Sequence, residues 1–415
     1  MNKIKGTQDF IDLQLFNFII DQAKKQCEEY NFSQIATPIL EPTELFKRSL
    51  GLETDVVSKE MYTVDTGPDG DKICLRPEVT ASTVRAFIEN GIQNTPWKVF
   101  SWGAMFRHER PQKGRYRQFH QFNLEVIGSD AIAQDAQCLK MLDSLFASKF
   151  QLNEYALMIN FLGTSEERKL YTKELHAYLE TVADKICKTC TTRKESNIMR
   201  VFDCKNPDCQ ALYDTAPKII EHLGEESAAE WKQLQEQLGV LSVSYTINPK
   251  LVRGLDYYSK TVFEFVSPNL GSQNAFCGGG RYNNLVKAIG GKVDQPSIGA
   301  SIGIERMIMM LEPIKDTLLL PQPAALTVII PLSGEQQTLA LLVSDHLHGQ
   351  QLTNEVLFDG SVKSMMRKAN KMGATFTVLI GTDEQENRTV TVKNMVTSAE
   401  ETMDQTKLIQ YLKKA

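Results

Sequence analysis

The chain has 415 residues, of which 42% are hydrophobic and 23% are charged, and its formal net charge is −5 at pH 7. This composition is typical of a water-soluble globular protein with roughly two or three domains, and it argues against a membrane-spanning protein and a uniformly basic nucleic-acid coat. The eight cysteines and the start MNKIKGTQDF, which lacks an apolar export signal, lead us to expect reduced thiols and a cytoplasmic location.

Helical and extended patterns alternate over the first part of the chain. Apolar residues recur at helical spacing over residues 10–30, and a short strand is predicted over residues 35–40. A polar helix is predicted from Thr43 and another from Thr80. Glu78, just before the second helix, has a simple explanation, because an acid at that position compensates the helix dipole.

Residues 97–127 predict an antiparallel hairpin with the sequence WKVFSWGAMFRHERPQKGRYRQFHQFNLEVI. Each arm alternates apolar and polar residues, which is typical of a strand with one face on a core. The loop at residues 108–117 is long, since hairpin loops usually have about 2–5 residues. It indicates either a solvated basic loop or a roof of arginines that holds phosphates, because five cations accompany the single acid Glu109. The cations are Arg107, Arg110, Lys113, Arg115 and Arg117.

A mostly helical insertion is predicted at residues 165–245, where helical, charged segments interrupt the strand-rich pattern. It contains four cysteines that could hold a zinc ion. The spacing of the second pair is loose, and Cys204 follows apolar residues, so ordinary thiols are the favoured interpretation and no metal site is predicted. The four are Cys187, Cys190, Cys204 and Cys209.

Glycine-containing segments follow the insertion. LVRGLDYYSKTVFEF places Arg253 ahead of a predicted strand that bears Tyr257 and Tyr258. CGGGRY supplies three consecutive glycines, which favour either a turn or a close approach of the backbone to a ligand. GASIGIERMIMML predicts a helix whose first turn holds Arg306, although the helix dipole disfavours a cation there. A cation in an unfavourable place indicates an anionic partner.

Strands and helices alternate beyond the prolines at residues 321–323. This alternation predicts a small α/β domain with a mainly parallel sheet. The chain is therefore divided into residues 1–322 and 323–415. One predicted helix of the second domain carries four cations on one face, which fits either an RNA-binding surface or a solvated charged one. They are Lys363, Arg367, Lys368 and Lys371.

Six segments, in this order, resemble those of the histidyl-tRNA synthetases, which are class II aminoacyl-tRNA synthetases. They are KGTQDF, RPEVTAS, FRHERPQKGRYRQFHQ, LVRGLDYYS, GGGRY and GIER, and the resemblance covers essentially the whole chain. Val79 departs from the pattern, because the family often has glycine there, but Glu78 and Thr80 are kept. The resemblance implies an α+β fold with an antiparallel sheet flanked by helices in the catalytic domain, a helical insertion, and a C-terminal α/β anticodon-binding domain.

The same resemblance implies a reaction and its partners. Such an enzyme joins L-histidine to ATP as histidyl-adenylate, releases pyrophosphate, and transfers the histidyl group to the 3′ end of tRNA(His). ATP is a substrate, and Mg²⁺ accompanies it. A homodimer formed through the region near residues 37–50 is implied, and no membrane partner.

Residue roles are implied by matching the motifs position by position. Arg107 and Arg253 would be catalytic, because adenylate formation depends on positioning and on stabilising charge at the α-phosphate. Glu125 and Tyr258 would bracket the imidazole, whose two nitrogens need polar partners. ATP would be bound by Arg107, Arg115 and Arg306. The acceptor end of the tRNA would meet Arg110, Gln112 and Arg117. Histidine would be bound by Glu78, Thr80, Arg107, Gln121, Glu125, Arg253, Tyr257, Tyr258 and Tyr282.

Two alternatives belong to other functional classes. A regulatory paralogue would keep the fold without aminoacylating, but it is expected to lose site residues and the terminal domain. This chain keeps Arg107, Arg253, Glu125 and Tyr258. A generic nucleotide-binding module would explain neither the imidazole-type pocket nor the RNA-sized second domain. The sequence therefore favours a catalytic member of the family.

Overall fold

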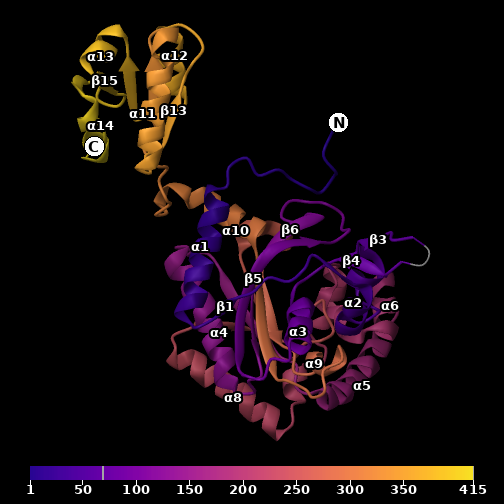
Figure 1. Ribbon diagram of the computed structural model, residues 1–415. Coiled ribbons are helices and arrows are strands. Elements are labelled where there is room, and N and C mark those ends of the chain that lie inside the picture. The colour runs from indigo at the N-terminus through magenta and orange to yellow at the C-terminus, as the bar shows by residue number, and fades with distance from the viewer. Residues whose placement is uncertain (68–69, 415) are drawn as a thin grey trace. The chain divides into compact units, whose positions relative to one another are not determined.

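The chain forms two compact units, Met1–Leu320 and Pro321–Ala415. The computed structural model describes residues 1–67 and 70–414. Figure 1 shows that each unit has its own sheet and its own helices. The first unit ends close to residue 322, where the sequence analysis divided the chain.

An eight-stranded sheet with the order β1-β5-β6-β11-β10-β9-β7-β8 organises the first unit. The pairs β1·β5 and β7·β8 at the two edges are parallel, and the five pairs between them are antiparallel. The prediction of an antiparallel catalytic sheet is therefore confirmed. The strands are β1 (Ser33–Gln34), β5 (Trp97–Phe106), β6 (Gln118–Ile127), β7 (Ala156–Phe161), β8 (Thr246–Ile247), β9 (Ser259–Val266), β10 (Ala275–Arg281) and β11 (Ser297–Gly303).

The hairpin predicted at residues 97–127 is present as β5 and β6. Phe100 stacks on Phe122 across the pair, with 5.5 Å between ring centroids, and both rings lie in the main core. The other side of β6 carries polar residues that are nonetheless buried, with Asn123 at 1% and Glu125 at 2% exposure. A buried polar strand face needs partners for its side chains, so it marks the place where a site can be built.

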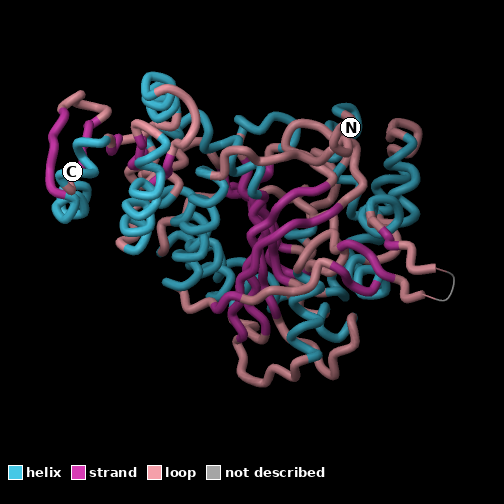
Figure 2. Tube along the Cα trace, turned by 45° about the horizontal axis from the view of Figure 1, so that its top comes forward, coloured by secondary structure: helices cyan, strands magenta, loops and turns pink. Residues whose placement is uncertain are grey.

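Helices cover both faces of this sheet (Figures 1 and 2). Residues of α1 (Gln14–Glu29), α4 (Ile132–Ser144), α8 (Glu225–Val240) and α10 (Ile304–Leu311) share the main core with the strands. Residues of α3 (Thr80–Glu89) and α9 (Leu285–Ala288) pack together in a smaller cluster, and α2 (Thr43–Leu50) packs beside a three-stranded sheet. That sheet has the order β2-β4-β3, with β2 (Leu40–Pro42), β3 (Thr63–Val64) and β4 (Ile73–Leu75). Among the described residues, no helix is long and apolar enough to cross a bilayer.

The predicted insertion is helical, and its last helix belongs to the main core. It contains α5 (Ser165–Thr181), α6 (Lys188–Ser196), the 3-10 helix η3 (Ile198–Asp203), α7 (Pro207–Tyr213) and α8. A capping box starts α5, because Thr164 accepts from the Glu167 N–H while the Glu167 carboxylate accepts from the Thr164 N–H. Trp231 and Leu234 of α8 pack into the core of the main sheet. The insertion therefore begins with a core of its own and ends with a helix packed on the main sheet.

One strand prediction near the insertion is wrong. Tyr257 and Tyr258 lie in an irregular turn, and β9 begins only at Ser259. Consecutive side chains in a strand point to opposite faces, whereas these two rings lie together, with centroids 4.6 Å apart. The turn thus brings both tyrosines to the same side.

The second unit is an α/β domain with a mixed sheet of order β13-β12-β14-β15-β16. The pairs β13·β12 and β12·β14 are parallel, but β14·β15 and β15·β16 are antiparallel. The expectation of a mainly parallel sheet is therefore wrong. The last strand was missed because Met403 is its one buried side chain. The elements are β12 (Thr327–Pro331), α11 (Gln337–Gly349), β13 (Asn354–Val356), α12 (Val362–Lys371), β14 (Phe376–Ile380), α13 (Thr382–Asn387), β15 (Thr389–Asn394), β16 (Glu400–Asp404) and α14 (Leu408–Lys414).

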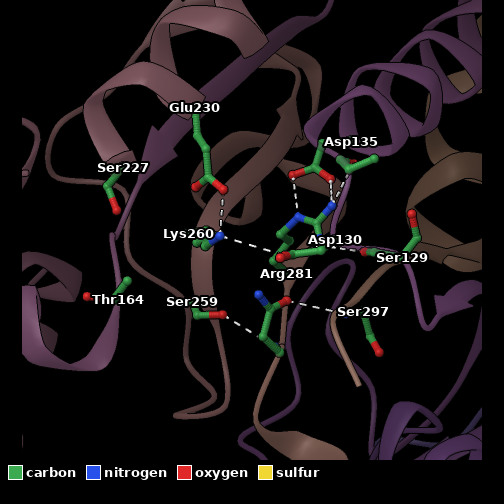
Figure 3. A network of polar contacts seen from close by, with 12 residues as sticks. Ser129, Asp130, Asp135, Thr164, Ser227, Glu230, Ser259, Lys260, Arg281 and Ser297 are labelled. Atoms are coloured by element: carbon green, nitrogen blue, oxygen red, sulfur yellow. Dashed lines mark hydrogen bonds and ion pairs between the residues drawn. The ribbon is translucent and has the colours of Figure 1, made fainter. Parts of the chain in front are cut away.

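A buried ion pair fastens the main sheet to α4 (Figure 3). Arg281 at the end of β10 is fully buried, and its Nη2 lies 2.6 Å from Asp135 Oδ1. The same guanidinium donates to two main-chain carbonyls before α4, at 2.8 and 2.9 Å. Beside it, Lys260 of β9 pairs with Glu230 of α8 at 2.7 Å. These contacts hold α8 against β9 and α4 against β10.

Replacing Asp135 with alanine should lower the free energy of unfolding of the first unit by about 3–5 kcal/mol, because Arg281 is left buried without its counter-charge. Urea unfolding of the full chain measures the loss. The control is Glu166→Ala, which removes an exposed pair with Lys169 at 2.8 Å and should leave stability nearly unchanged. Equal effects of the two variants would contradict the structural role of the buried pair.

Candidate active site

A cavity of about 870 Å³ lies beside the polar face of the main sheet. Its walls come from β6, β10, the hairpin loop, α10, residues 252–258 and the insertion. Its volume lies in the range of about 300–1,000 Å³ that is usual for small-molecule sites. The predicted site residues on its wall are Glu78, Arg107, Arg115, Gln121, Arg253, Tyr257, Tyr258 and Arg306.

Four of the arginines that line the cavity reach it from separate elements. Arg107 follows β5, Arg115 lies in the hairpin loop, Arg253 precedes β9, and Arg306 is in the first turn of α10. Burial, together with the charges of Arg107 and Arg115, lowers the pKa of Arg306 to about 10. Burial likewise lowers the pKa of Arg107. Gathering like charges in a partly buried space is unfavourable, so the arrangement calls for a polyanionic ligand.

Main-chain carbonyls hold two of these guanidinium groups in place. Arg107 Nε donates to the Pro77 carbonyl at 2.9 Å, and its guanidinium carbon lies 5.4 Å from the centre of the Phe119 ring. Arg306 Nε donates to the Gly114 carbonyl at 3.0 Å. Each anchor uses only part of the five N–H groups of a guanidinium. A fixed cation of this kind binds an anion with little further loss of side-chain freedom.

The other two arginines are paired with acids that were not among the predicted site residues. Arg253 Nη1 forms a short ion pair with Glu264 of β9, and Arg115 Nε forms one with Glu109 of the loop. Arg115 also lies 3.8 Å from Glu60. An acid in the alternating segment TVFEF reads as an ordinary polar strand position, so nothing in the sequence marked Glu264.

The consecutive glycines lie inside β10 and make room for these side chains. A Cβ atom on Gly278 would sit 2.7 Å from an Arg253 guanidinium nitrogen. One on Gly299 of the neighbouring strand would overlap the Glu125 carboxylate. Of the two roles that the sequence left open, the structure supports close approach, and the groups that approach are the protein's own side chains.

Three predicted site residues form a hydrogen-bonded cluster next to the cavity wall. Thr80 Oγ1 donates to Glu125 Oε1 at 2.7 Å, and the Tyr282 hydroxyl makes a short hydrogen bond to Glu125 Oε2. Burial raises the pKa of Glu125, the two hydrogen bonds offset part of that rise, and the pKa is about 8. The Tyr282 ring lies 5.7 Å from the ring of Tyr257, which lines the cavity. Because a carboxylate has about four lone-pair sites, two protein donors leave room for a ligand donor.

Glu78 and Gln121 play different parts at the cavity wall. The Glu78 carboxylate accepts from the N–H groups of Thr80 at 2.8 Å and Ala81 at 2.9 Å, so it caps α3 as helix-dipole logic predicts. Gln121 Oε1 is buried and has no hydrogen-bond partner within residues 1–67 and 70–414. A buried acceptor without a partner is costly, so this oxygen is suited to a ligand N–H group.

The three residues expected to meet tRNA do not share one environment. Arg110 and Gln112 are exposed on the hairpin loop. Arg117 instead donates to the carbonyls of Glu109 at 3.2 Å and Lys5 at 3.4 Å, and so ties the loop to the N-terminal segment KGTQDF. The structure therefore gives Arg117 a positioning role within the chain itself.

Comparison with known proteins matches both units. A family model described as Histidyl-tRNA synthetase matches residues 18–307, and one described as Anticodon binding domain matches residues 327–415. The histidine–tRNA ligase of Halothermothrix orenii is 41% identical over 99% of this chain and 98% of its own length. That of Clostridioides difficile is 38% identical over 99% and 98%.

Solved structures give the same relationship at the level of the fold. The apo structure of S. aureus histidyl-tRNA synthetase covers 100% of both chains, with a TM-score of 0.82 and 34% identity. A Bacillus halodurans structure titled ATP phosphoribosyltransferase regulatory subunit/histidyl-tRNA synthetase covers 92% of this chain and 97% of its own, with a TM-score of 0.63 and 18% identity. The second likeness concerns the fold alone. Because the family model spans most of the catalytic unit and the first relatives match along their whole length, the chain belongs to the histidyl-tRNA synthetase family.

Proposed function

We propose that this chain is a histidine–tRNA ligase, which activates L-histidine with ATP and transfers the histidyl group to the 3′ end of tRNA(His). The observation that carries the proposal is one cavity that joins two chemistries. Arginines gather on its wall, and the buried Glu125 cluster adjoins it. A ligand that joins a nucleotide to a small polar ring would place its phosphate beside the arginines and its ring beside the Glu125 cluster.

ATP supplies the polyanion that the arginines call for. Arg107, Arg115 and Arg306 bind its phosphates, and Arg253 faces the reacting α-phosphate. A carboxylate oxygen of histidine attacks the α-phosphorus, a P–O bond forms, and pyrophosphate leaves with the electron pair of the broken bond. Arg107 and Arg253 act here by stabilising the charge that grows on the α-phosphate oxygens.

Acidic residues of the cavity wall would hold the Mg²⁺ that accompanies ATP, and the ion would neutralise part of the phosphate charge. The cavity wall fits this ion, since carboxylate oxygens are ligands that Mg²⁺ prefers. Glu109 and Glu264 both line the cavity and would supply such oxygens.

Histidine occupies the part of the cavity near the Glu125 cluster. Glu125 and Tyr258 bracket the imidazole, and Gln121 Oε1 accepts from the amino group. Glu78, Thr80, Tyr257 and Tyr282 complete this pocket, chiefly by holding Glu125 and the cavity wall. Recognition by polar groups discriminates strongly, because an amino acid without the imidazole nitrogens leaves buried partners unsatisfied.

The remaining surfaces are assigned to RNA and to a second copy of the chain. Residues 1–322 form the catalytic domain with its insertion at 165–245, and residues 323–415 grip the anticodon. Arg110, Gln112 and Arg117 serve the acceptor end, with Arg117 acting through the position of the loop.

A homodimer forms through the region at residues 37–50. Its support is that Ile39 and Leu40 are 44% and 52% exposed there. The site of action is the cytoplasm, where the eight unpaired thiols fit a reducing environment.

Histidine-dependent exchange of pyrophosphate into ATP by the purified full chain tests the function. Exchange should require histidine and should not occur with other amino acids. A chain that binds ATP without exchange would instead fit the regulatory alternative.

Glu125→Gln should raise the KM for histidine by about tenfold or more, because an amide is a weaker acceptor than a carboxylate and cannot satisfy the same donors. The KM for ATP should change little. Pyrophosphate exchange at varied histidine and ATP concentrations measures both constants.

The pH dependence of the wild type provides the control for this variant. Below a pKa of about 8 the empty site holds neutral Glu125, and an imidazole N–H binds the ionised form better. Histidine affinity should therefore rise as the pH increases through about 8, and the Glu125→Gln variant should not show this rise. A histidine affinity independent of pH in both proteins would contradict the assignment.

Arg253→Gln should slow adenylate formation about 100-fold or more with little loss of ATP binding, because its charge is needed mainly in the transition state. Arg253→Lys should rescue the rate only in part, since lysine lacks the planar fork. Single-turnover adenylation gives the rate, and equilibrium titration gives ATP affinity. A rate within about tenfold of the wild type, or about 1.4 kcal/mol, would refute the role.

Replacing the four cations of α12 with glutamine should weaken tRNA(His) binding about tenfold or more and reduce its salt dependence, while pyrophosphate exchange stays unchanged. All four side chains are exposed, and α12 packs on the sheet through Met365 and Ala369. A matched control replaces Lys413 and Lys414 of α14, which are exposed cations of the same domain. Equal tRNA affinity for both variants would mean that the α12 cations form a solvated surface that does not bind tRNA.

A further inference from the structure

Four cysteines of the insertion converge on one point. Cys187 precedes α6, Cys190 lies in its first turn, Cys204 follows η3, and Cys209 lies in α7. All four Sγ atoms lie within 4.8 Å of one another, and those of Cys187 and Cys204 are 3.7 Å apart. The loose spacing in the sequence did not keep the thiols apart, because η3 and the turn after it fold back onto α6.

The helices that carry these cysteines are short and bury few side chains of their own. The nine residues of α6 bury a single side chain, that of Cys190. The seven residues of α7 bury Cys209 and Tyr213. Helices this short are marginal in water, and apolar packing normally stabilises them. The thiols lie at the edge of an apolar cluster that includes Tyr171 and Leu175 of α5 and Val201 of η3, and they are the main contribution of α6 and α7 to it.

Hydrogen-bond donors surround the sulfur atoms. The Cys187 N–H donates to Cys209 Sγ at 3.2 Å, and the Asn206 N–H donates to Cys204 Sγ at 3.4 Å. The Tyr213 hydroxyl is buried, and it faces the Cys190 thiol. Neutral thiols are weak acceptors, whereas thiolates accept such donors well.

We propose that Cys187, Cys190, Cys204 and Cys209 bind one Zn²⁺ ion as a structural site. Zinc with four thiolates is tetrahedral with Zn–S distances of about 2.3 Å, which places the sulfurs about 3.8 Å apart. The distance between Cys187 Sγ and Cys204 Sγ is already close to that value. The N–H donors and the Tyr213 hydroxyl then orient the thiolates and offset part of their charge, as groups around metal ligands do.

The remaining cysteines show what an ordinary thiol looks like in this protein. Cys27, Cys74, Cys138 and Cys277 are each buried, and none belongs to a cluster of potential metal ligands among the described residues. They behave as small apolar side chains. Within the described residues, only the cysteines of the insertion come together, and they do so from three short segments.

The zinc site would stiffen one wall of the active-site cavity. Cys187 and Cys204 line the cavity together with Arg193 and Asn206. The insertion is also tied to the rest of the first unit, because Arg200 of η3 pairs with Asp55 at 2.9 Å. Zinc binding therefore couples the fold of the insertion to the shape of the cavity.

Metal analysis of the full chain, purified without a polyhistidine tag, tests the proposal. The protein should hold about one zinc per chain after dialysis, and mercurial blocking of thiols should release it. Removing the metal with a chelator should lower the thermal midpoint and speed amide exchange in α6 and α7, and zinc alone should restore both. The Cys190→Ser and Cys187→Ser variants should lose the metal.

Cys27→Ser is the matched control, because Cys27 is 1% exposed and Cys190 is 0% exposed, but Cys27 lies in the main core. It should keep a full complement of zinc whatever its effect on stability. Less than about a tenth of a zinc per chain in the wild type, with no rise on adding zinc, would overturn the proposal. So would iron with a visible absorption band, or a disulfide among the four cysteines.

Discussion

The site depends on positive charge held where water is scarce. Partly buried arginines repel one another, and burial lowers the pKa of Arg107 and of Arg306. The chain meets this cost with carbonyl anchors for Arg107 and Arg306 and with the acids Glu109 and Glu264 beside the other two arginines. These groups keep the empty cavity stable and leave its wall ready for phosphates. On the proposed function, the same positive charge would bind the phosphates of ATP and stabilise the α-phosphate during the reaction.

The main sheet and the helices packed on it hold the cavity wall in place. Antiparallel pairing of β6, β11 and β10 places Glu125 opposite Gly299, and the missing side chain there gives the carboxylate its space. The fully buried pair of Arg281 and Asp135 fastens the end of β10 to α4. The insertion closes the cavity from another side, and three of its four clustered thiols are buried in an apolar cluster with residues of α5 and η3.

Much of this arrangement was predictable from sequence, for reasons that particular residues show. Alternating patterns gave the hairpin, and arginines in unusual places, such as Arg306 in a first helical turn, pointed to an anion. Long-range pairings were not predictable. Glu264 reads as an ordinary strand acid until Arg253 lies against it, and the cysteines of α6 and α7 meet only because η3 folds back. Residues Tyr257 and Tyr258 looked like strand because their local pattern is apolar and aromatic, whereas the turn that precedes β9 is set by packing.

A crystal structure of the full chain with a stable sulfamate analogue of histidyl-adenylate tests the central claim most directly. The account predicts that the group replacing the α-phosphate lies within about 3.2 Å of Arg107 and Arg253, and that an imidazole nitrogen lies within the same distance of Glu125. An analogue bound with its ring away from Glu125, or outside the arginine-lined cavity, would contradict it.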